Sequence, residues 1–196
     1  MNILKFLKKP RHTARRLFPQ KNLSDAEYIA EYYNNYNEDA WLNNMQERKI
    51  VMITKEETAR GLFSMGYNCA QAVLGALCEE NGLDIKAALK LASGFGGGMR
   101  YGEVCGAVSG AVMAVGLKCG FYAEKDFEQK GFCNKKSFEF MEKFKEKNGS
   151  VLCRDLLGAD IRSPEDHNKP EIQALHKTVC PELVASAVLI LEKMEF

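Results

Sequence analysis

Apolar side chains recur at three- and four-residue intervals through most of the chain, and no stretch shows the alternation of a half-buried strand. The stretch from Val104 to Leu117 is continuously apolar, but its length and many small residues favour a buried helix. We therefore predict an all-α fold, an irregular multi-helix bundle. From residue 66 onward, glycines separate the predicted helices, which cover residues 68–81, 84–93, 103–118, 135–147, 150–157, 170–178 and 181–195.

Two helix starts are predicted in the first third of the chain. Ser24 and Glu27 form a capping-box pattern before a tyrosine-rich helical extension, and Thr54 and Glu57 repeat this pattern before a helix that ends near Gly66. Residues 1–22 precede both and carry seven Lys and Arg residues with no acid. We divide the chain into a basic arm plus helical N-terminal extension, residues 1–50, and a four-cysteine helical domain, residues 51–196.

Overall charge limits the partners that we expect. The 196 residues hold 27 Lys and Arg against 26 Asp and Glu, so no overall field attracts nucleic acid. Residues 1–22 are either a solvated tail or a contact with an anionic membrane surface or an acidic partner. Arg15, Arg16 and Phe18 are similar to a twin-arginine signal, but no apolar stretch follows. We expect a cytoplasmic protein without a transmembrane segment.

The seven cysteines do not suit a disulfide scaffold in a reducing compartment. Four of them occupy the same kind of position relative to the predicted helices. Each lies within the first turn of a different predicted helix: Cys69, Cys105, Cys153 and Cys180. Free N–H groups and the helix dipole at such a position lower the pKa of a thiol. Thiolates serve both redox chemistry and metal ligation, so converging helix starts would suit an iron–sulfur cluster. The spacing contains no C-x-x-C pair that would indicate a zinc ribbon or a thioredoxin-like motif.

Gly106 and Gly110 lie on one face of the helix that Cys105 opens. There are two interpretations of this pair. The small residues let another backbone approach closely, which would bring helix starts together, or they reflect ordinary packing in a buried helix.

The segment Cys105-Gly106-Ala107-Val108-Ser109-Gly110 resembles the C-G-A-x-x-G motif of the C_GCAxxG_C_C family of redox-active proteins, which has four characteristic cysteines. The resemblance extends from about residue 55 to 190. It includes the segment around Cys69, the glycine-rich residues 93–104, Cys153 with Arg154, and Cys180. It implies a small redox protein that holds an iron–sulfur or similar group, with a redox partner among oxidoreductases or transporter-associated proteins.

Our leading hypothesis is electron transfer or redox sensing through a [2Fe–2S] or [4Fe–4S] cluster, with Cys69, Cys105, Cys153 and Cys180 as its ligands. The alternatives are a cofactor-free thiol–disulfide protein that uses the same cysteines, and a structural zinc-binding helical module. No nucleophile–base constellation is apparent, so we expect an electron carrier or accessory redox protein rather than a stand-alone enzyme. An exposed cluster would also suit a homodimer interface.

The remaining candidates receive structural interpretations. Cys78 is interpreted as core packing, while Cys119 and Cys133 are spare thiols, although fraying would let Cys119 approach Cys105. His176 is a helix-end residue or a nitrogen ligand, and the remaining histidines, His12 and His167, are expected at the surface. The glycine loop over residues 94–98 lacks the context of a phosphate cradle and is expected to pass close to the sulfur site, with Arg100 and Glu103 adding charge there. Arg154 and Asp155 are expected at a helix surface, with Arg154 the weaker candidate for stabilising a thiolate.

Overall fold

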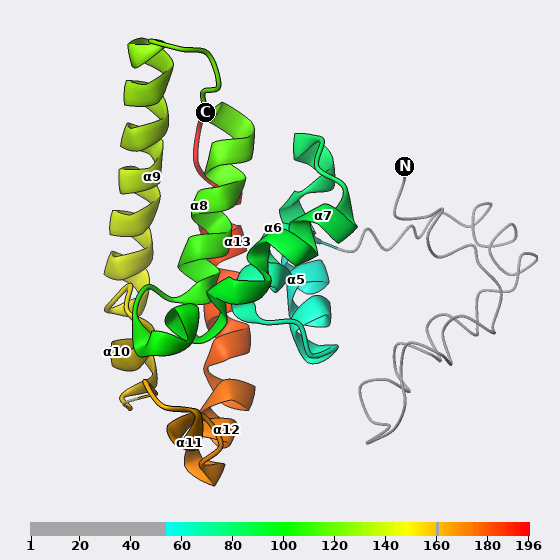
Figure 1. Cartoon of the computed structure of the whole chain (residues 1–196), viewed down its shortest axis with the longest axis vertical. Coiled ribbons are helices and arrows are strands. Elements are labelled where there is room, and N and C mark those ends of the chain that lie inside the picture. The colour runs from blue at the N-terminus through cyan, green and yellow to red at the C-terminus, as the bar shows by residue number, and fades with distance from the viewer. Residues whose placement is uncertain (1–53, 160) are drawn as a thin grey trace, which may run out of the picture. The chain divides into compact units, whose positions relative to one another are not determined.

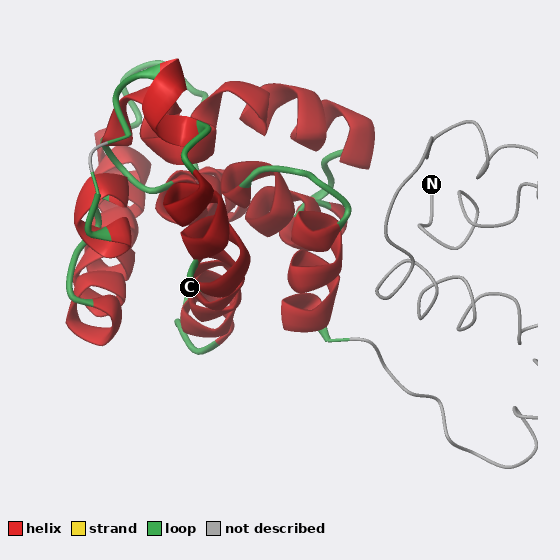
Figure 2. Cartoon of the chain, turned by 90° about the horizontal axis from the view of Figure 1, so that it is seen from below, coloured by secondary structure: helices red, strands yellow, loops and turns green. Residues whose placement is uncertain are grey.

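The computed structural model describes residues 54–159 and 161–196, and helices make up nearly all of its regular structure (Figure 1). Figure 2 shows this part of the chain as helices joined by loops, and its extended backbone pairs only at one isolated bridge between Val104 and Leu152. The predicted all-α fold is confirmed. The α-helices are α5 (Lys55–Ser64), α6 (Cys69–Leu77), α7 (Ile85–Leu91), α8 (Gly106–Cys119), α9 (Phe127–Asn148), α10 (Cys153–Leu157), α11 (Pro164–His167), α12 (Pro170–Thr178) and α13 (Cys180–Glu192).

The predictions for residues 1–53 lie outside the described residues. These predictions are the basic arm, its contact with a membrane or an acidic partner, and the helical extension. Residues 54–196 form one compact unit by themselves.

Most predicted helix boundaries differ from the observed ones by a few residues, and two segments differ more. Helix α9 begins at Phe127 rather than at residue 135, because the Asp126 side chain caps its first turn by accepting a hydrogen bond from Gln129 N at 3.0 Å. The loop predicted around residues 163–168 contains the short helix α11, which Ser163 caps in the same way. Both starts depend on caps that lie inside polar stretches, where hydrophobic periodicity gives no signal.

The core lies between α6, α8, α9 and α13, which pack against one another. In Figure 1, α8 and α9 run side by side. The largest fully buried side chains come from all four helices and include Leu74, Val108, Phe140, Phe144 and Val184. Burial of each such side chain stabilises the fold by roughly 1.5–3 kcal/mol. The smaller helices α10, α11 and α12 therefore attach to a frame that is already well packed.

Helices α6 and α8 approach each other through glycines. A Cβ atom on Gly110 would lie 2.6 Å from the carbonyl oxygen of Ala70, and one on Gly106 would lie 3.1 Å from both Ala70 N and Cys69 Cβ. Of the two interpretations of this glycine pair, the close approach of another backbone is the observed one. It brings the first turn of α8 against the first turn of α6.

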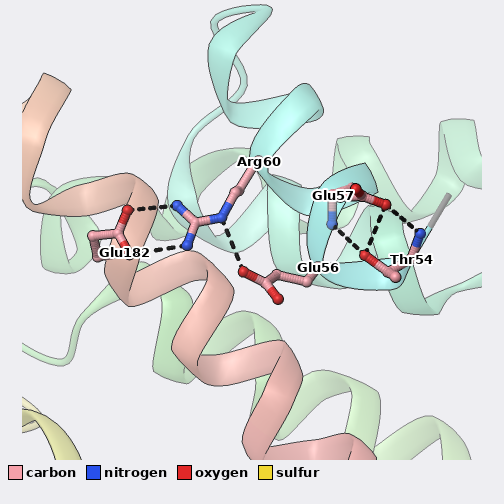
Figure 3. Close-up of polar contacts among 5 residues, drawn as sticks. All are labelled: Thr54, Glu56, Glu57, Arg60 and Glu182. Carbon is pink, nitrogen blue, oxygen red and sulfur yellow. Dashed lines mark hydrogen bonds and ion pairs between the residues drawn. The ribbon is translucent and has the colours of Figure 1, made fainter.

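Helix α5 is joined to the start of α13 by ionic contacts (Figure 3). The Arg60 guanidinium donates to both carboxylate oxygens of Glu182, at 2.6 and 2.9 Å, and to Glu56 at 3.1 Å. The predicted capping box is present as well, because Thr54 and Glu57 each bond to the other's backbone N–H group. Bidentate arginine–carboxylate pairs fix geometry better than single contacts, so this pair holds α5 against the first turn of α13.

Helices α12 and α13 form a nearly continuous stretch. Val179, between them, keeps a helical conformation (φ −90°, ψ −47°), and Pro181 follows in the first turn of α13. Proline has no backbone N–H and interrupts the helical hydrogen bonds at this point. The stretch Pro170–Glu192 is long and apolar enough to cross a membrane, but half of its most apolar window is buried inside the protein, as in the core helix of a globular domain.

We predict that Gly110→Ala lowers the free energy of unfolding by about 1–3 kcal/mol, because the new methyl group would overlap the backbone of Ala70. Gly116→Ala, in the same helix, is the matched control. A Cβ there has no neighbour within 4 Å, so replacing glycine should stabilise the helix by up to about 1 kcal/mol. Urea unfolding of both variants measures the difference. Equal effects of the two substitutions would contradict the close approach.

Candidate functional site

All four candidate cysteines begin helices, as predicted. Cys69 is the first residue of α6, Cys105 is the N-cap of α8, Cys153 is the first residue of α10, and Cys180 is the first residue of α13. All four are buried, with exposed fractions of 8%, 2%, 5% and 5% in that order. Cys180 differs from the other three, because α12 leads into its helix almost without interruption. It therefore lacks the fully open helix start that the sequence suggested.

The four thiols come together in two contacting pairs. The Cys69 side chain forms a hydrogen bond with that of Cys180, and the Cys105 side chain forms one with that of Cys153. The two pairs are also close to each other. This is evident from the electrostatic influence of Cys105 and Cys153, which raises the pKa of Cys69. Residues separated by up to 111 positions in the sequence (180 − 69) thus meet at one buried place.

Backbone contacts hold this arrangement. Cys105 N donates to Val151 O at 2.8 Å, and Cys153 N donates to Glu103 O at 2.7 Å. These two bonds flank the isolated bridge between residues 104 and 152 and align the starts of α8 and α10. On the other side, Asn68 caps α6 by accepting from Ala70 N and Gln71 N, both at 3.0 Å. Three of the four helix starts that carry a cysteine, those of α6, α8 and α10, are therefore fixed by these hydrogen bonds.

The pKa of Cys105 is lowered. The main cause is the hydrogen bond from the Cys153 thiol, and the backbone N–H groups of Ala107 and Val108 in the first turn of α8 act in the same direction. Burial opposes them. The predicted effect of a helix start on a thiol is confirmed at this cysteine, with a neighbouring thiol as the larger contribution. Cys105 is the sulfur in this site that is best prepared to carry negative charge.

For Cys69 and Cys153 the prediction of a lowered pKa is wrong. The pKa of Cys69 is raised well above its ordinary value, first by its hydrogen bond with Cys180 and then by burial. The pKa of Cys153 is raised first by its hydrogen bond with Cys105 and then by burial. A helix start favours the thiolate only modestly, whereas burial among other sulfurs disfavours a second negative charge strongly. The sequence alone does not show which thiols become neighbours.

The glycine-rich loop passes beside the sulfurs, as expected. A Cβ on Gly96 would lie 2.5 Å from Asn68 Cβ, next to Cys69 in the chain, and a Cβ on Gly106 would lie 3.0 Å from Phe95 O. The four residues 97–100 all adopt a left-handed conformation, with φ between +57° and +62°. Met99 and Arg100 do so without being glycine, which is uncommon and costs energy. No pattern in the sequence predicted this left-handed turn.

Arg154 and Asp155 lie at the surface of α10, as expected. Arg154 forms an ion pair with Glu103, and Ser150 Oγ donates to Asp155 at 2.8 Å. The half-exposed Arg154–Glu103 pair spans the segments that carry Cys105 and Cys153. The guanidinium thus connects these segments, and the pKa shifts of Cys69, Cys105 and Cys153 come from other sulfurs, from burial and from backbone N–H groups.

Of the remaining cysteines, Cys78 is a core residue as predicted. It is fully buried and donates its S–H to Gly75 O at 3.2 Å. Cys119 contacts Cys133 and not Cys105, because Cys105 and Cys119 lie at opposite ends of the intact helix α8. The fraying that would let Cys119 approach Cys105 is not observed, since α8 is helical up to Cys119.

The surface position predicted for His167 is wrong, since only 7% of this residue is exposed. It packs against the loop at Gly97, where a Cβ would lie 2.9 Å from His167 Cε1, so the missing side chain leaves room for the ring. His176 is half-buried beside it, with ring centroids 6.0 Å apart. Burial lowers the pKa of both histidines. His12 lies outside the described residues.

Although the four cysteines are close together, they do not form a site for a single metal ion in the described part of the chain. Within residues 54–159 and 161–196, no three side chains of His, Cys, Asp or Glu are placed to hold one metal ion. The four buried cysteines are instead arranged two by two.

Comparison with known proteins gives one match. The model of a protein family described as "Putative redox-active protein (C_GCAxxG_C_C)" matches residues 67–194, a span that includes all four cysteines. No curated protein and no solved structure matches the chain.

We predict that Cys153→Ala raises the pKa of Cys105, because the substitution removes the hydrogen bond that favours the thiolate most. The measurement is a pH titration of the reduced, metal-free protein, monitored by the ultraviolet absorbance of thiolates. The first thiolate should form at a higher pH in the variant than in the wild type. Cys78→Ala is the matched control, since Cys78 contacts a backbone carbonyl instead of a cysteine. A first titration step that stays at the same pH in Cys153→Ala would contradict the pairing.

Proposed function

The chain belongs to the C_GCAxxG_C_C family of redox-active proteins, and on this premise we propose that its four converging cysteines carry the redox chemistry as ligands of an iron–sulfur cluster. The observation that supports this proposal most is that four buried thiols from four separate helix starts meet in one place. Four cysteine thiolates are the usual ligand set of both [2Fe–2S] and [4Fe–4S] clusters.

The two-by-two arrangement favours a [2Fe–2S] cluster. Such a cluster takes two ligands on each of its two irons, and the pairs Cys69 with Cys180 and Cys105 with Cys153 match this distribution. When bound, the cluster supplies one-electron transfer. A redox partner protein, an oxidoreductase or a transporter-associated protein, would provide and accept the electrons.

The surrounding residues have defined tasks in this proposal. The N–H groups of Ala107 and Val108 stabilise negative charge on the Cys105 sulfur, which is one of the means by which a protein sets a reduction potential. Burial of all four cysteines keeps water away from the sulfurs. Cys69 and Cys153 hold their protons firmly in the free thiol form, so ligation at these two residues releases protons and should weaken as pH falls.

A second candidate function uses the same four cysteines without a cofactor. Each contacting pair would lose two electrons and two protons to form a disulfide, Cys69 with Cys180 and Cys105 with Cys153. The direct thiol–thiol contacts within each pair favour this candidate. A structural zinc site is supported less, because zinc requires its ligands around one ion and the donors are grouped in pairs.

We predict that protein isolated without oxygen is brown and holds about two iron and two acid-labile sulfide per chain. The single substitutions Cys105→Ser and Cys180→Ser, one from each pair, should each lower the iron content and weaken the visible absorption. Cys78→Ser should leave both unchanged, because Cys78 lies outside the pairs.

Three other results would contradict the cluster. A colourless protein that remains free of iron and sulfide after chemical reconstitution rules it out. If that protein forms disulfides Cys69–Cys180 and Cys105–Cys153 under a mild oxidant, the second candidate is correct. Bound zinc, with loss of helicity on chelation, would indicate the structural module.

A further inference from the structure

A second pair of cysteines lies at the other end of α8. Cys119 is the last residue of α8 and Cys133 lies in the second turn of α9, and their side chains form a hydrogen bond. Cys105 begins the same helix, whose 14 residues rise by about 21 Å. The pair of Cys119 and Cys133 is therefore separate from the four-cysteine site.

The two helices hold these cysteines in register. Gln129 Nε2, in the first turn of α9, donates to Cys119 O at 2.7 Å and joins the start of α9 to the end of α8. The seven residues 120–126 connect the helices, which lie side by side (Figure 1). The Cys119 side chain also belongs to the buried core, against which Cys133 packs. The two sulfurs thus face each other without any rearrangement of the helices.

The two cysteines differ in exposure. All seven cysteines lie in described residues, and Cys133 alone among them is not buried. Cys119 is 6% exposed and donates its S–H to Val115 O at 3.3 Å. A small reagent in solvent therefore reacts first with Cys133, and the buried Cys119 is the second thiol to react.

The surroundings of the pair act on Cys119 in opposite directions. Lys118 and Lys136 both favour the thiolate of Cys119, although burial and the neighbouring Cys133 raise its pKa to about 11. Both lysines lie over the ring of Phe196, with Nζ 4.4 Å and 5.6 Å from its centroid. Two positive side chains thus stand beside the thiol pair at the C-terminal end of the domain.

We propose that Cys119 and Cys133 form a second dithiol site, which reduces small disulfides and becomes an intramolecular disulfide between α8 and α9. The Cys133 thiolate attacks one sulfur of the small disulfide, whose S–S bond breaks, and one small thiol leaves after taking up a proton. Cys119 then loses its proton and attacks the Cys133 sulfur, and the second small thiol leaves. Two protein thiols are oxidised by two electrons in total, and one small disulfide is reduced to two thiols.

The experiment treats the full-length, reduced protein with oxidised glutathione, blocks the remaining thiols by alkylation, and digests with trypsin without a reductant. Cleavage after Lys118, Lys125, Lys130 and Lys135 places the two cysteines in separate peptides, residues 119–125 and 131–135. We expect a disulfide-linked pair of these two peptides, with two glutathione molecules released per disulfide formed. Cys78, which is fully buried, should not be oxidised by glutathione, so its peptide should be found in the alkylated form.

Two single variants test the order of the steps. Cys119→Ser should stop at a mixed disulfide on Cys133, seen as the addition of one glutathione. Cys133→Ser should leave Cys119 as a free thiol, because Cys119 is buried. Circular dichroism of both variants verifies that they fold. Absence of the linked peptides, or oxidation of Cys119 in Cys133→Ser at the wild-type rate, would overturn the proposal. Neither result depends on the iron content, so this test is independent of the cluster.

Discussion

Helices α6 and α8 touch through their backbones, and this contact brings together the helix starts that carry Cys69 and Cys105. Gly110 lets the backbone of α8 touch that of α6 at Ala70, and Gly106 removes the side chain that would separate Cys69 from the start of α8. No other residue type would allow this distance, since a Cβ at Gly110 would overlap a backbone oxygen. The C-G-A-x-x-G segment therefore has a structural reason for its glycines, which is to place Cys105 beside another cysteine.

Once the helix starts meet, the sulfurs themselves determine the electrostatics. Cys105 receives a hydrogen bond from Cys153 and the influence of two backbone N–H groups, so its thiolate is favoured. The proton that lowers the pKa of Cys105 is the one that Cys153 retains, which is why the two pKa values move in opposite directions. A buried group of four thiols thus accepts one negative charge readily and further charges only with compensation. A bound cation supplies such compensation, whereas oxidation to disulfides removes the thiolate charge altogether.

The sequence predicted local features well and distant neighbours poorly. The capping box at Thr54 and the positions of Cys69 and Cys153 at helix starts follow from a few adjacent residues, and all are present. The pairing of Cys69 with Cys180 depends on how α13 crosses α6, which no local pattern encodes. The burial of His167 likewise depends on the space beside Gly97, a contact between segments 70 residues apart (167 − 97). Local hydrogen bonds are readable in sequence, whereas contacts between helices require the folded chain.

Helix α8 shows how one element gives two thiols opposite properties. At its first turn, N–H groups without a helical partner favour the thiolate of Cys105. At its last turn, Cys119 is buried beside Cys133, and both its burial and this neighbouring thiol favour the protonated form. The pKa of Cys119 is therefore raised, while that of Cys105 is lowered. One helix thus carries, at its start, a thiol suited to holding negative charge and, at its end, a thiol whose surroundings keep it protonated.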